Sequence, residues 1–277
     1  MAPGLISFVG AGPGAPDLLT LRGAHRLAAA DVVVWASSLV PAAVLEHCRD
    51  GVERHDSAGM TLEDVLTVYT AHPGAAIVRL HSGDVSLYSA LAEQISWCTR
   101  HDRAFEIVPG VGSLAAAAAA AGVELTAPGV AQSVVLTRLG GGRTGASMPA
   151  RESVAGFAGH GTTMAIYLSA ARPAALRAEL LAGYPPRTPA VVVAKGSWPD
   201  ETVITTTVDG LADALTASGI RTAALVLVGP ALASPALSST GTRSRLYDPT
   251  YSHGCRRRSL PGTTTGRPIP TAKRRHP

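Results

Sequence analysis

The chain has few cysteines, few aromatic residues and no apolar run long enough to cross a membrane. Its 277 residues include only Cys48, Cys98 and Cys255, an odd number at scattered spacings. This count excludes a disulfide framework and fits a reducing, cytoplasmic environment. The longest apolar stretch, 114–121, is too short to span a bilayer, and the few residues before the first apolar strand leave no room for a signal peptide. We therefore expect a cytoplasmic protein without a membrane partner.

Acidic residues are missing from the last part of the chain, where basic residues gather. Residues 250–277 contain seven Lys or Arg residues and no Asp or Glu, so the other 249 residues hold 17 basic and 20 acidic side chains. The net charge of +4 therefore comes from the tail. Its Pro, Gly, Thr and Arg content predicts a disordered, solvated tail. A basic tail can contact nucleic acid, but the acidic balance of the body argues against that partner.

Apolar strands alternate with helical patterns along the body, as they do in α/β proteins with parallel sheets. We expect two α/β domains with mostly parallel or mixed sheets, at residues 1–121 and 122–249, followed by the disordered basic tail at 250–277. A ligand would bind between the two domains. The expected strands are 5–9, 32–35, 77–80 and 105–108 in the first domain, and 133–138, 163–168, 190–194, 203–207 and 223–228 in the second.

Two turns rich in small residues follow apolar strands in the first domain. The first is Gly10-Ala-Gly-Pro-Gly14, and the second is Ser82-Gly-Asp84. Ligands bind at the carboxyl ends of parallel strands in open α/β sheets. These turns therefore favour an enzyme that acts on a small molecule, although a tight turn without a ligand is the alternative at the first one.

The first turn differs from a dinucleotide-binding loop in three ways. Its spacing is G-x-G-P-G instead of G-x-G-x-x-G. Pro13 has no backbone N–H for a pyrophosphate, and Asp31 stands at the start of the second strand instead of its end. We also expect Asp17 to cap a helix over 18–29, whose start Pro16 delays. A nicotinamide cofactor is therefore not predicted.

The chain resembles the tetrapyrrole methylases, which use S-adenosylmethionine. The resemblance covers residues 4 to about 249, and the segments 37–39, 56–60 and 197–201 are similar to those of members that methylate corrin-ring precursors in cobalamin biosynthesis. The motifs that carry it are, in order, 10–23, 35–39, 56–61, 79–84, 108–113, 132–138, 163–169, 197–201 and 221–225.

The resemblance implies a methyltransferase that binds S-adenosylmethionine and releases S-adenosylhomocysteine. It implies a large tetrapyrrole substrate rich in carboxylates, bound through cationic and hydroxyl side chains, and a homodimer. Substrate-binding candidates are Ser37, Ser38, Arg138 and Lys195. Cofactor-binding candidates are Pro13, Ser82, Gly83, Asp84, Gly112, Ser113, Leu168, Gly196 and Ala224.

Several residues have competing interpretations. His81 could remove a ring proton after methylation or contact a carboxylate, or it could be a structural histidine. Asp84 could bind the cofactor or cap the next helix. Thr61 and Asp64 fit a capping box, so their role is structural. Cys98 and His101 offer too few ligands for a closed zinc site, so no metal is expected.

Two other classes of function remain as alternatives. A methylase of the same fold could act on a macromolecule, such as ribosomal RNA or diphthine, or on another tetrapyrrole position. A macromolecule methylase would lack the Ser37-Ser-Leu39 and Asp56-Ser-Ala-Gly-Met60 segments present here. A nucleic-acid-binding protein would rest on the basic tail alone. The sequence favours the corrin-ring C-methyltransferase.

Overall fold

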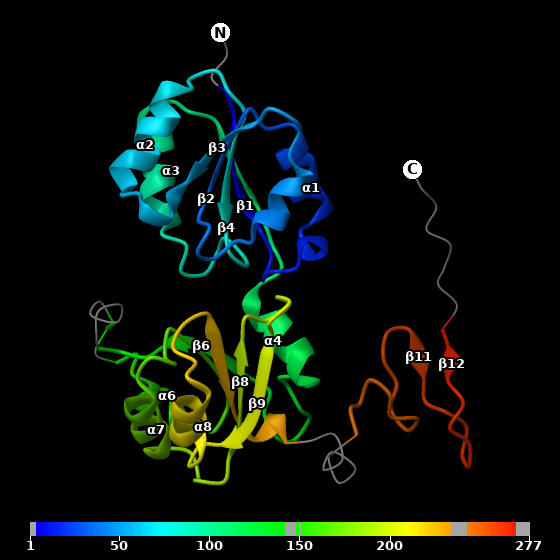
Figure 1. Ribbon diagram of the computed structural model, residues 1–277. Helices are drawn as coiled ribbons and strands as arrows, with labels where there is room; N and C mark the ends of the chain where they lie inside the picture. Colours follow the sequence, from blue (N-terminus) through cyan, green and yellow to red (C-terminus); the bar gives the residue numbers. More distant parts are fainter. Residues whose placement is uncertain (1–3, 142–147, 150, 234–242, 270–277) are drawn as a thin grey trace.

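Two α/β units stacked on one another form the body of the protein, and a small sheet lies near the C-terminus (Figure 1). The computed structural model describes residues 4–141, 148–149, 151–233 and 243–269. The expected fold class, α/β with parallel and mixed sheets, is confirmed. Within the described residues, no helix is long and apolar enough to cross a membrane.

The first unit is a five-stranded parallel sheet in the order β3-β2-β4-β1-β5. Helix α1 covers one face, and α2 and α3 cover the other (Figure 1). Because both faces are buried, the central strands are apolar at consecutive positions. The strands are β1 (Ile6–Gly10), β2 (Val32–Trp35), β3 (Glu53–Asp56), β4 (Ile77–His81) and β5 (Phe105–Val108), and the helices are α1 (Leu21–Ala28), α2 (Leu62–Ala71) and α3 (Leu91–Arg100).

The second unit is a mixed sheet in the order β6-β7-β10-β8-β9. Strands β6 and β7 are parallel, and the other neighbours are antiparallel. Helices α6, α7 and α8 cover one face. The strands are β6 (Val134–Arg138), β7 (Thr163–Tyr167), β8 (Pro189–Ala194), β9 (Thr202–Thr207) and β10 (Ala224–Val228), and the helices are α6 (Val154–Ala158), α7 (Pro173–Leu181) and α8 (Leu211–Ser218).

Helix α4 (Ser113–Ala121) follows β5 in the chain but packs on the second sheet. Ala117 is 2% exposed and lies in one apolar cluster with Val193 and Leu225. The helix falls inside the range 1–121 that the sequence suggested for the first domain. By packing, the chain crosses to the second unit at residues 109–112, directly after β5.

The start of α1 differs from the expectation of an Asp17-capped helix over 18–29. Asp17 lies in a short 3-10 helix, η1 (Pro16–Leu18), and the chain is extended at Leu19. Thr20 then caps α1 by accepting a hydrogen bond from Gly23 N at 3.1 Å. The extended residues between the two helices prevent one continuous helix. The capping box predicted for α2 is confirmed, with Thr61 and Asp64 bonded reciprocally.

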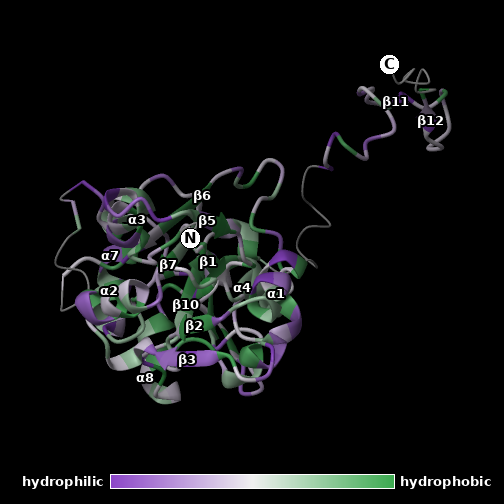
Figure 2. Cartoon of the chain, turned by 90° about the horizontal axis from the view of Figure 1, so that it is seen from above, coloured by the Kyte–Doolittle hydropathy of each residue, from purple (hydrophilic) through white to green (hydrophobic). Residues whose placement is uncertain are grey.

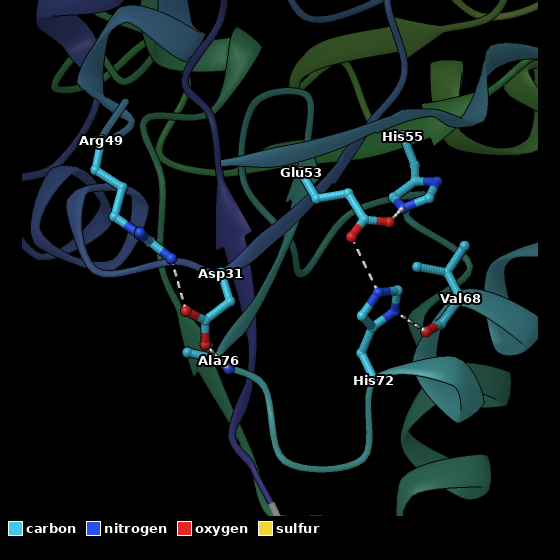
Figure 3. A network of polar contacts seen from close by, with 7 residues as sticks. All are labelled: Asp31, Arg49, Glu53, His55, Val68, His72 and Ala76. Carbon is cyan, nitrogen blue, oxygen red and sulfur yellow. Dashed lines mark hydrogen bonds and ion pairs between the residues drawn. The ribbon is translucent and has the colours of Figure 1, made fainter. Parts of the chain in front are cut away.

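Strand β3 was not predicted from the sequence, because it is polar and lies at the edge of the sheet. Figure 2 shows it as a hydrophilic strand beside hydrophobic ones. Glu53 accepts hydrogen bonds from His55 Nε2 at 2.6 Å and His72 Nε2 at 3.1 Å, as Figure 3 shows. His72 ends α2, so this contact ties the helix to the edge strand. Such charged contacts suit an edge that would otherwise pair with another chain.

The C-terminal segment contains a two-stranded antiparallel sheet, β11 (Arg256–Arg257) and β12 (Arg267–Pro268). Figures 1 and 2 both draw it apart from the two larger sheets. The structure therefore differs from the expected disordered tail over residues 250–269, which form hydrogen bonds with one another. Residues 270–277 lie outside the described residues.

Candidate functional site: the cleft between the two units

The turns after β1 and β4 are hydrogen-bonded to each other at the lower edge of the first sheet. Gly12 N donates to Gly83 O at 3.2 Å, and Gly83 N donates to Gly12 O at 2.8 Å. Both glycines have positive φ, of 81° and 68°, which suits residues without a Cβ. Because these N–H groups are already bonded, they are not available to a pyrophosphate. This geometry agrees with the exclusion of a dinucleotide loop.

Close backbone approach also joins the ends of β1 and β5. A Cβ on Gly10 would lie 2.6 Å from Gly110 Cα and 2.7 Å from Gly83 O. Side chains at these positions would push the strand ends apart. Glycines therefore let three strand ends converge on one narrow edge.

Asp84 ties two of these turns together. Its carboxylate accepts hydrogen bonds from Ser86 N at 2.9 Å and from Gly110 N at 2.8 Å. Burial acts to raise the pKa of Asp84, but hydrogen bonds from Ser86 and Gly110 outweigh it and hold this pKa below its usual range. Asp84 does not cap the following helix, because α3 begins only at Leu91 and its N-cap is Ala90.

The second unit contributes a wall with unusual backbone geometry. Leu168, Lys195 and Ala223 all have φ near +50°, a conformation rare for residues with side chains. Lys195 N donates to Ala223 O at 2.8 Å, so two of these turns support each other. Strained backbone of this kind persists where the surrounding structure fixes it and is common at functional sites.

Two residues of the β8–β9 turn reach across to the first glycine turn. Ala15 N donates to Ser197 Oγ at 3.0 Å, and Trp198 Nε1 donates to Pro13 O at 2.9 Å. A Cβ on Gly14 would lie 2.1 Å from the indole of Trp198, so glycine is needed for the ring to pack there. These contacts join the two units at one end of the cleft.

A pair of tyrosines joins the units elsewhere. The ring centroids of Tyr88, from the first unit, and Tyr167, from the second, are 5.1 Å apart. The guanidinium of Arg138 lies 5.9 Å from the Tyr88 ring centroid, a cation–π distance. Ser113 Oγ lies at hydrogen-bond distance, 3.5 Å, from Tyr167 Oη.

A cleft of about 630 Å³ lies between the units. This volume falls in the range of roughly 300–1,000 Å³ that small-molecule sites occupy. Six expected cofactor-binding residues line it: Pro13, Ser82, Ser113, Leu168, Gly196 and Ala224. Three expected substrate-binding residues line it as well: Ser37, Ser38 and Lys195.

The remaining expected residues do not line this cleft. Gly83 and Asp84 hold the turn behind Ser82, and Gly112 stands at the N-cap of α4. Arg138 lies beside Tyr88, whose ring contacts the cleft residue Tyr167. The side-chain ammonium group of Lys195 forms an ion pair with the carboxylate of Asp200.

His81 is poorly placed to act as a base. It is 7% exposed, its Nε2 is buried without a hydrogen-bond partner, and it does not line the cleft. Burial, and then the charge of Arg79, lower the pKa of His81 to about 3. The ring is therefore neutral at physiological pH and is packed near Phe8, with centroids 6.2 Å apart. This position fits the structural interpretation.

Sequence reasoning missed several cleft residues. Tyr167, Trp198 and Arg221 line the cleft but were not named as site residues. Trp198 and Arg221 lie in the family-like segments 197–201 and 221–225, so the signal was present. The contact of Trp198 with Pro13 crosses between the units, and no local pattern shows this.

No group of three or more metal-binding side chains occurs within the described part of the chain. His101 instead contacts the Trp97 carbonyl through Nδ1 at 2.8 Å and stacks on the Trp97 ring, with centroids 4.4 Å apart. Cys98 is buried nearby with a free thiol.

A parallel α/β sheet, a second mixed sheet and a cleft between them define the class of two-unit enzymes that bind a small molecule at strand ends. Comparison with known proteins identifies the family. A profile described as Tetrapyrrole (Corrin/Porphyrin) Methylases matches residues 5–212. The chain belongs to this family.

Individual relatives are similar over nearly their whole length. The cobalt-precorrin-4 C(11)-methyltransferase of Priestia megaterium is 43% identical over 253 residues, which cover 90% of this chain and 96% of that protein. The X-ray structure of a cobalamin biosynthetic enzyme, cobalt precorrin-4 methyltransferase, is 42% identical with a TM-score of 0.80, covering 83% of this chain and 96% of that one. Uroporphyrin-III C-methyltransferase from Thermus thermophilus, complexed with S-adenosylhomocysteine, is 28% identical with a TM-score of 0.68, covering 83% and 94%.

Proposed function

We propose that this protein methylates C-11 of precorrin-4, or of its cobalt-loaded form, in cobalamin biosynthesis, with S-adenosylmethionine as the methyl donor. One observation carries the proposal. Six residues expected from the sequence to hold the cofactor, which come from both units, line one cleft of suitable size. The names of the similar proteins above support the substrate.

The residues of the cleft fit a ligand with both apolar and polar parts. Leu39, Ala117 and Leu225 supply apolar wall, and hydroxyl groups come from Ser37, Ser82 and Ser113. The turns at Leu168, Lys195 and Ala223 bring main-chain groups to the same wall. This set suits an adenosyl group joined to an amino acid.

When bound, S-adenosylmethionine would supply a methyl group activated by the positive charge of its sulfur. The protein's task is to hold the two partners in line. Such positioning can contribute roughly 7–11 kcal/mol to lowering a barrier. We assign it to the glycine-rich edge of the first sheet and to the Ser197–Trp198 contacts that join the units.

Cationic side chains at the cleft would bind the carboxylates of the macrocycle. Lys195 and Arg221 line it, and Arg138 lies next to Tyr88. In Lys195→Ala and Arg138→Ala, macrocycle binding should weaken by about 1.5–3 kcal/mol, the usual range for hydrogen bonds to charged groups. The affinity for S-adenosylhomocysteine should stay nearly unchanged. Unchanged macrocycle binding in both variants would place the substrate elsewhere.

Product analysis tests the proposed reaction. Purified protein is incubated with S-adenosylmethionine labelled in the methyl group and with precorrin-4 or cobalt-precorrin-4. We expect one labelled methyl group on the ring, located at C-11 by NMR. Methylation at another ring carbon would assign a different tetrapyrrole substrate. Labelling of RNA or protein alone would overturn the proposal.

We further propose that the protein forms a homodimer. Phe105 and Ile107 on the edge strand β5 are 38% and 47% exposed, and Leu136 on the edge strand β6 is 39% exposed. A second copy would cover such apolar edges. Light scattering should give a dimer mass for the native chain and a lower mass for Ile107→Lys. A monomeric native chain would contradict this proposal.

A further inference from the structure

Two short segments follow neighbouring strands of the first sheet and meet beside the cleft. Strands β2 and β3 are parallel neighbours, and their last residues, Trp35 and Asp56, are paired. The segment after β2, residues 36–40, therefore starts beside the segment after β3, at the carboxyl edge where ligands bind in such sheets. Ser37 and Ser38 line the cleft, and Asp56 does not.

Asp56 holds the tip of segment 36–40. Its Oδ1 accepts hydrogen bonds from Ser37 N at 3.0 Å and from Ala58 N at 2.9 Å. Hydrogen bonds from the side chain and main chain of Ser37, and then from Ala58 N, hold the pKa of Asp56 below its ordinary 3.8. The ionised carboxylate offers only acceptors, so the donors of Ser37 are turned toward it. Within the described chain, and apart from the bonds to Asp56, no hydrogen bond reaches Ser37 or Ser38 from another element.

The two ends of segment 36–40 are held in a different way. Ser57 Oγ donates to Trp35 O at 3.0 Å and accepts from Nη1 of Arg79, which is partly buried on β4. At the other end, Val40 is 1% exposed and packs in the core. The ends therefore rest on the interior of the unit, whereas the tip with the two serines depends on an exposed carboxylate.

The contact of Asp56 contributes little to holding the fold together. Asp56 is exposed and caps η3 (Ser57–Gly59), a 3-10 helix of three residues. Asp64 makes a similar set of hydrogen bonds with Thr61, but it caps the ten-residue helix α2. A carboxylate that orders exposed serines at a cleft is therefore better explained by what the cleft binds.

We propose that Asp56 is a positioning residue for the macrocyclic substrate, because it holds Ser37 and Ser38 so that their hydroxyl groups meet the macrocycle in the cleft. A group that is already ordered costs less conformational entropy when a ligand binds to it. Asp56 acts through the two serines and makes no contact of its own with the ligand. This inference rests on the proposed function, because it takes the tetrapyrrole as the ligand of this part of the cleft.

Binding of a stable tetrapyrrole tests the role of Asp56 without a turnover assay. The probe is uroporphyrin III, and its dissociation constant is measured by fluorescence titration. In Asp56→Ala, we expect this constant to rise about tenfold, the effect of losing a hydrogen bond to a charged group. Asp56→Asn keeps an oxygen at the position that accepts both main-chain N–H groups. It should therefore bind uroporphyrin within about threefold of the native protein.

A double-mutant cycle shows whether Asp56 acts through the serines. The variant Ser37→Ala/Ser38→Ala lacks both hydroxyl groups and should also bind uroporphyrin more weakly. Adding Asp56→Ala to this variant should weaken binding by less than about twofold further, because the groups that Asp56 positions are gone. A purely structural role would give the same added loss in both backgrounds.

Two further variants separate positioning from stability. Asp64→Ala removes an exposed capping carboxylate of the same unit that does not line the cleft. It should lower the melting temperature and leave uroporphyrin binding within about twofold of native. Asp56→Ser keeps a hydroxyl that caps η3, but its side chain is one bond shorter and loses the contact with Ser37. It should bind uroporphyrin as weakly as Asp56→Ala, and it replaces that variant if Asp56→Ala does not fold.

The affinity for S-adenosylhomocysteine should be unchanged in every variant, since the serines are assigned to the macrocycle. A loss of S-adenosylhomocysteine affinity in Asp56→Ala with native uroporphyrin binding would assign the segment to the cofactor and overturn the proposal. Uroporphyrin binding in folded Asp56→Ser within twofold of native would contradict it too.

Three more results would be incompatible with positioning by Asp56. Asp56→Asn as weak as Asp56→Ala would mean that the charge acts and not the acceptor. Fully additive losses in the cycle would mean that Asp56 does not act through the serines. Native protein that binds S-adenosylhomocysteine but no uroporphyrin would leave the serines without a macrocycle to meet. A protein that binds uroporphyrin through Asp56 but fails to methylate precorrin-4 would refute the proposed function only.

Discussion

Trp198 donates a hydrogen bond from its indole nitrogen to the carbonyl oxygen of Pro13, 2.9 Å away, across the boundary between the two units. The two residues are 185 positions apart in the chain. Pro13 belongs to the glycine turn after β1, and Trp198 lies in the turn between β8 and β9. Both line the cleft, so this contact joins the two units at the site.

Removing this hydrogen bond should weaken cofactor binding. Trp198→Phe keeps an aromatic ring but loses the donor, a change worth about 0.5–1.5 kcal/mol. Calorimetry should show S-adenosylhomocysteine binding about two- to tenfold more weakly. Trp97→Phe, on the buried side of α3 in the core of the first unit, should leave the affinity unchanged. Native affinity in folded Trp198→Phe would mean that the contact does not shape the site.

Gly83→Ala should lose both stability and ligand binding. Gly83 has φ of 68°, where a residue with a Cβ costs about 1–2 kcal/mol. Gly51 has a similar φ of 73°, and a Cβ there would meet no atom within 4 Å, so Gly51→Ala is the matched control. Urea unfolding should show similar losses in both variants. Only Gly83→Ala should bind S-adenosylhomocysteine more weakly. Equal affinities in Gly83→Ala and Gly51→Ala would show that this turn is not part of the binding site.

Glu106 should make stability depend on pH. It accepts hydrogen bonds from Arg26 and, at 2.7 Å, from Ser7 Oγ, and these hold its pKa below the ordinary 4.5. Its stabilisation is present above pH 4.5 and is lost as the pH falls through the lower folded pKa. Because Arg26 is 42% exposed, we expect Glu106→Gln to cost only about 1 kcal/mol at pH 7.

This difference in unfolding free energy should shrink to near zero in strong acid. The control is Glu46→Gln, an exposed residue without an ion pair in the described chain, which should change little at any pH. A loss in Glu106→Gln that is the same at pH 3 and pH 7 would contradict the assignment to the ionised carboxylate.

Deleting residues 243–277 should leave the melting temperature unchanged. The rate of methyl transfer should stay within a few-fold of that of the full chain. The polar contacts of 243–269, such as those of Arg256 with the carbonyls of Asp248 and Tyr251, stay within the segment. A segment without contacts to a core contributes little to its stability. A fall of several degrees in melting temperature would show that the tail packs on the body.

The accuracy of the sequence predictions followed the apolar character of each strand. Strands β2 and β5 lie at the predicted residues, 32–35 and 105–108, because apolar runs between turn residues have few other structures open to them. Strand β3 was missed because Glu53, Arg54 and His55 give an edge strand no apolar pattern. Its position depends on pairing with β2, which is a tertiary contact.

The site was predictable to a similar extent. Small residues at strand ends, such as Ser82 and Ser113, were expected at a ligand site and line the cleft. The packing of Trp198 on Gly14 and the burial of His81 could not be predicted, because they depend on the other unit or on the opposite face of the sheet. A local sequence pattern shows which residues lie at the end of a strand. It does not show which side chains contact the ligand.

Helix α4 has a consequence for how the protein melts. The helix continues directly from β5 of the first unit, yet its apolar side is buried by the sheet of the second. Division of the chain after residue 121 would therefore expose Ala117 and the Val193 and Leu225 side chains that pack with it. Because the Trp198–Pro13 and Tyr88–Tyr167 contacts join the two units, heat should unfold the body in a single all-or-none transition, with equal calorimetric and van't Hoff enthalpies. A chimaera that combines the first unit of one family member with the second unit of another should fold only if the junction lies before residue 109. Such a junction keeps α4 with the second sheet, on which it packs.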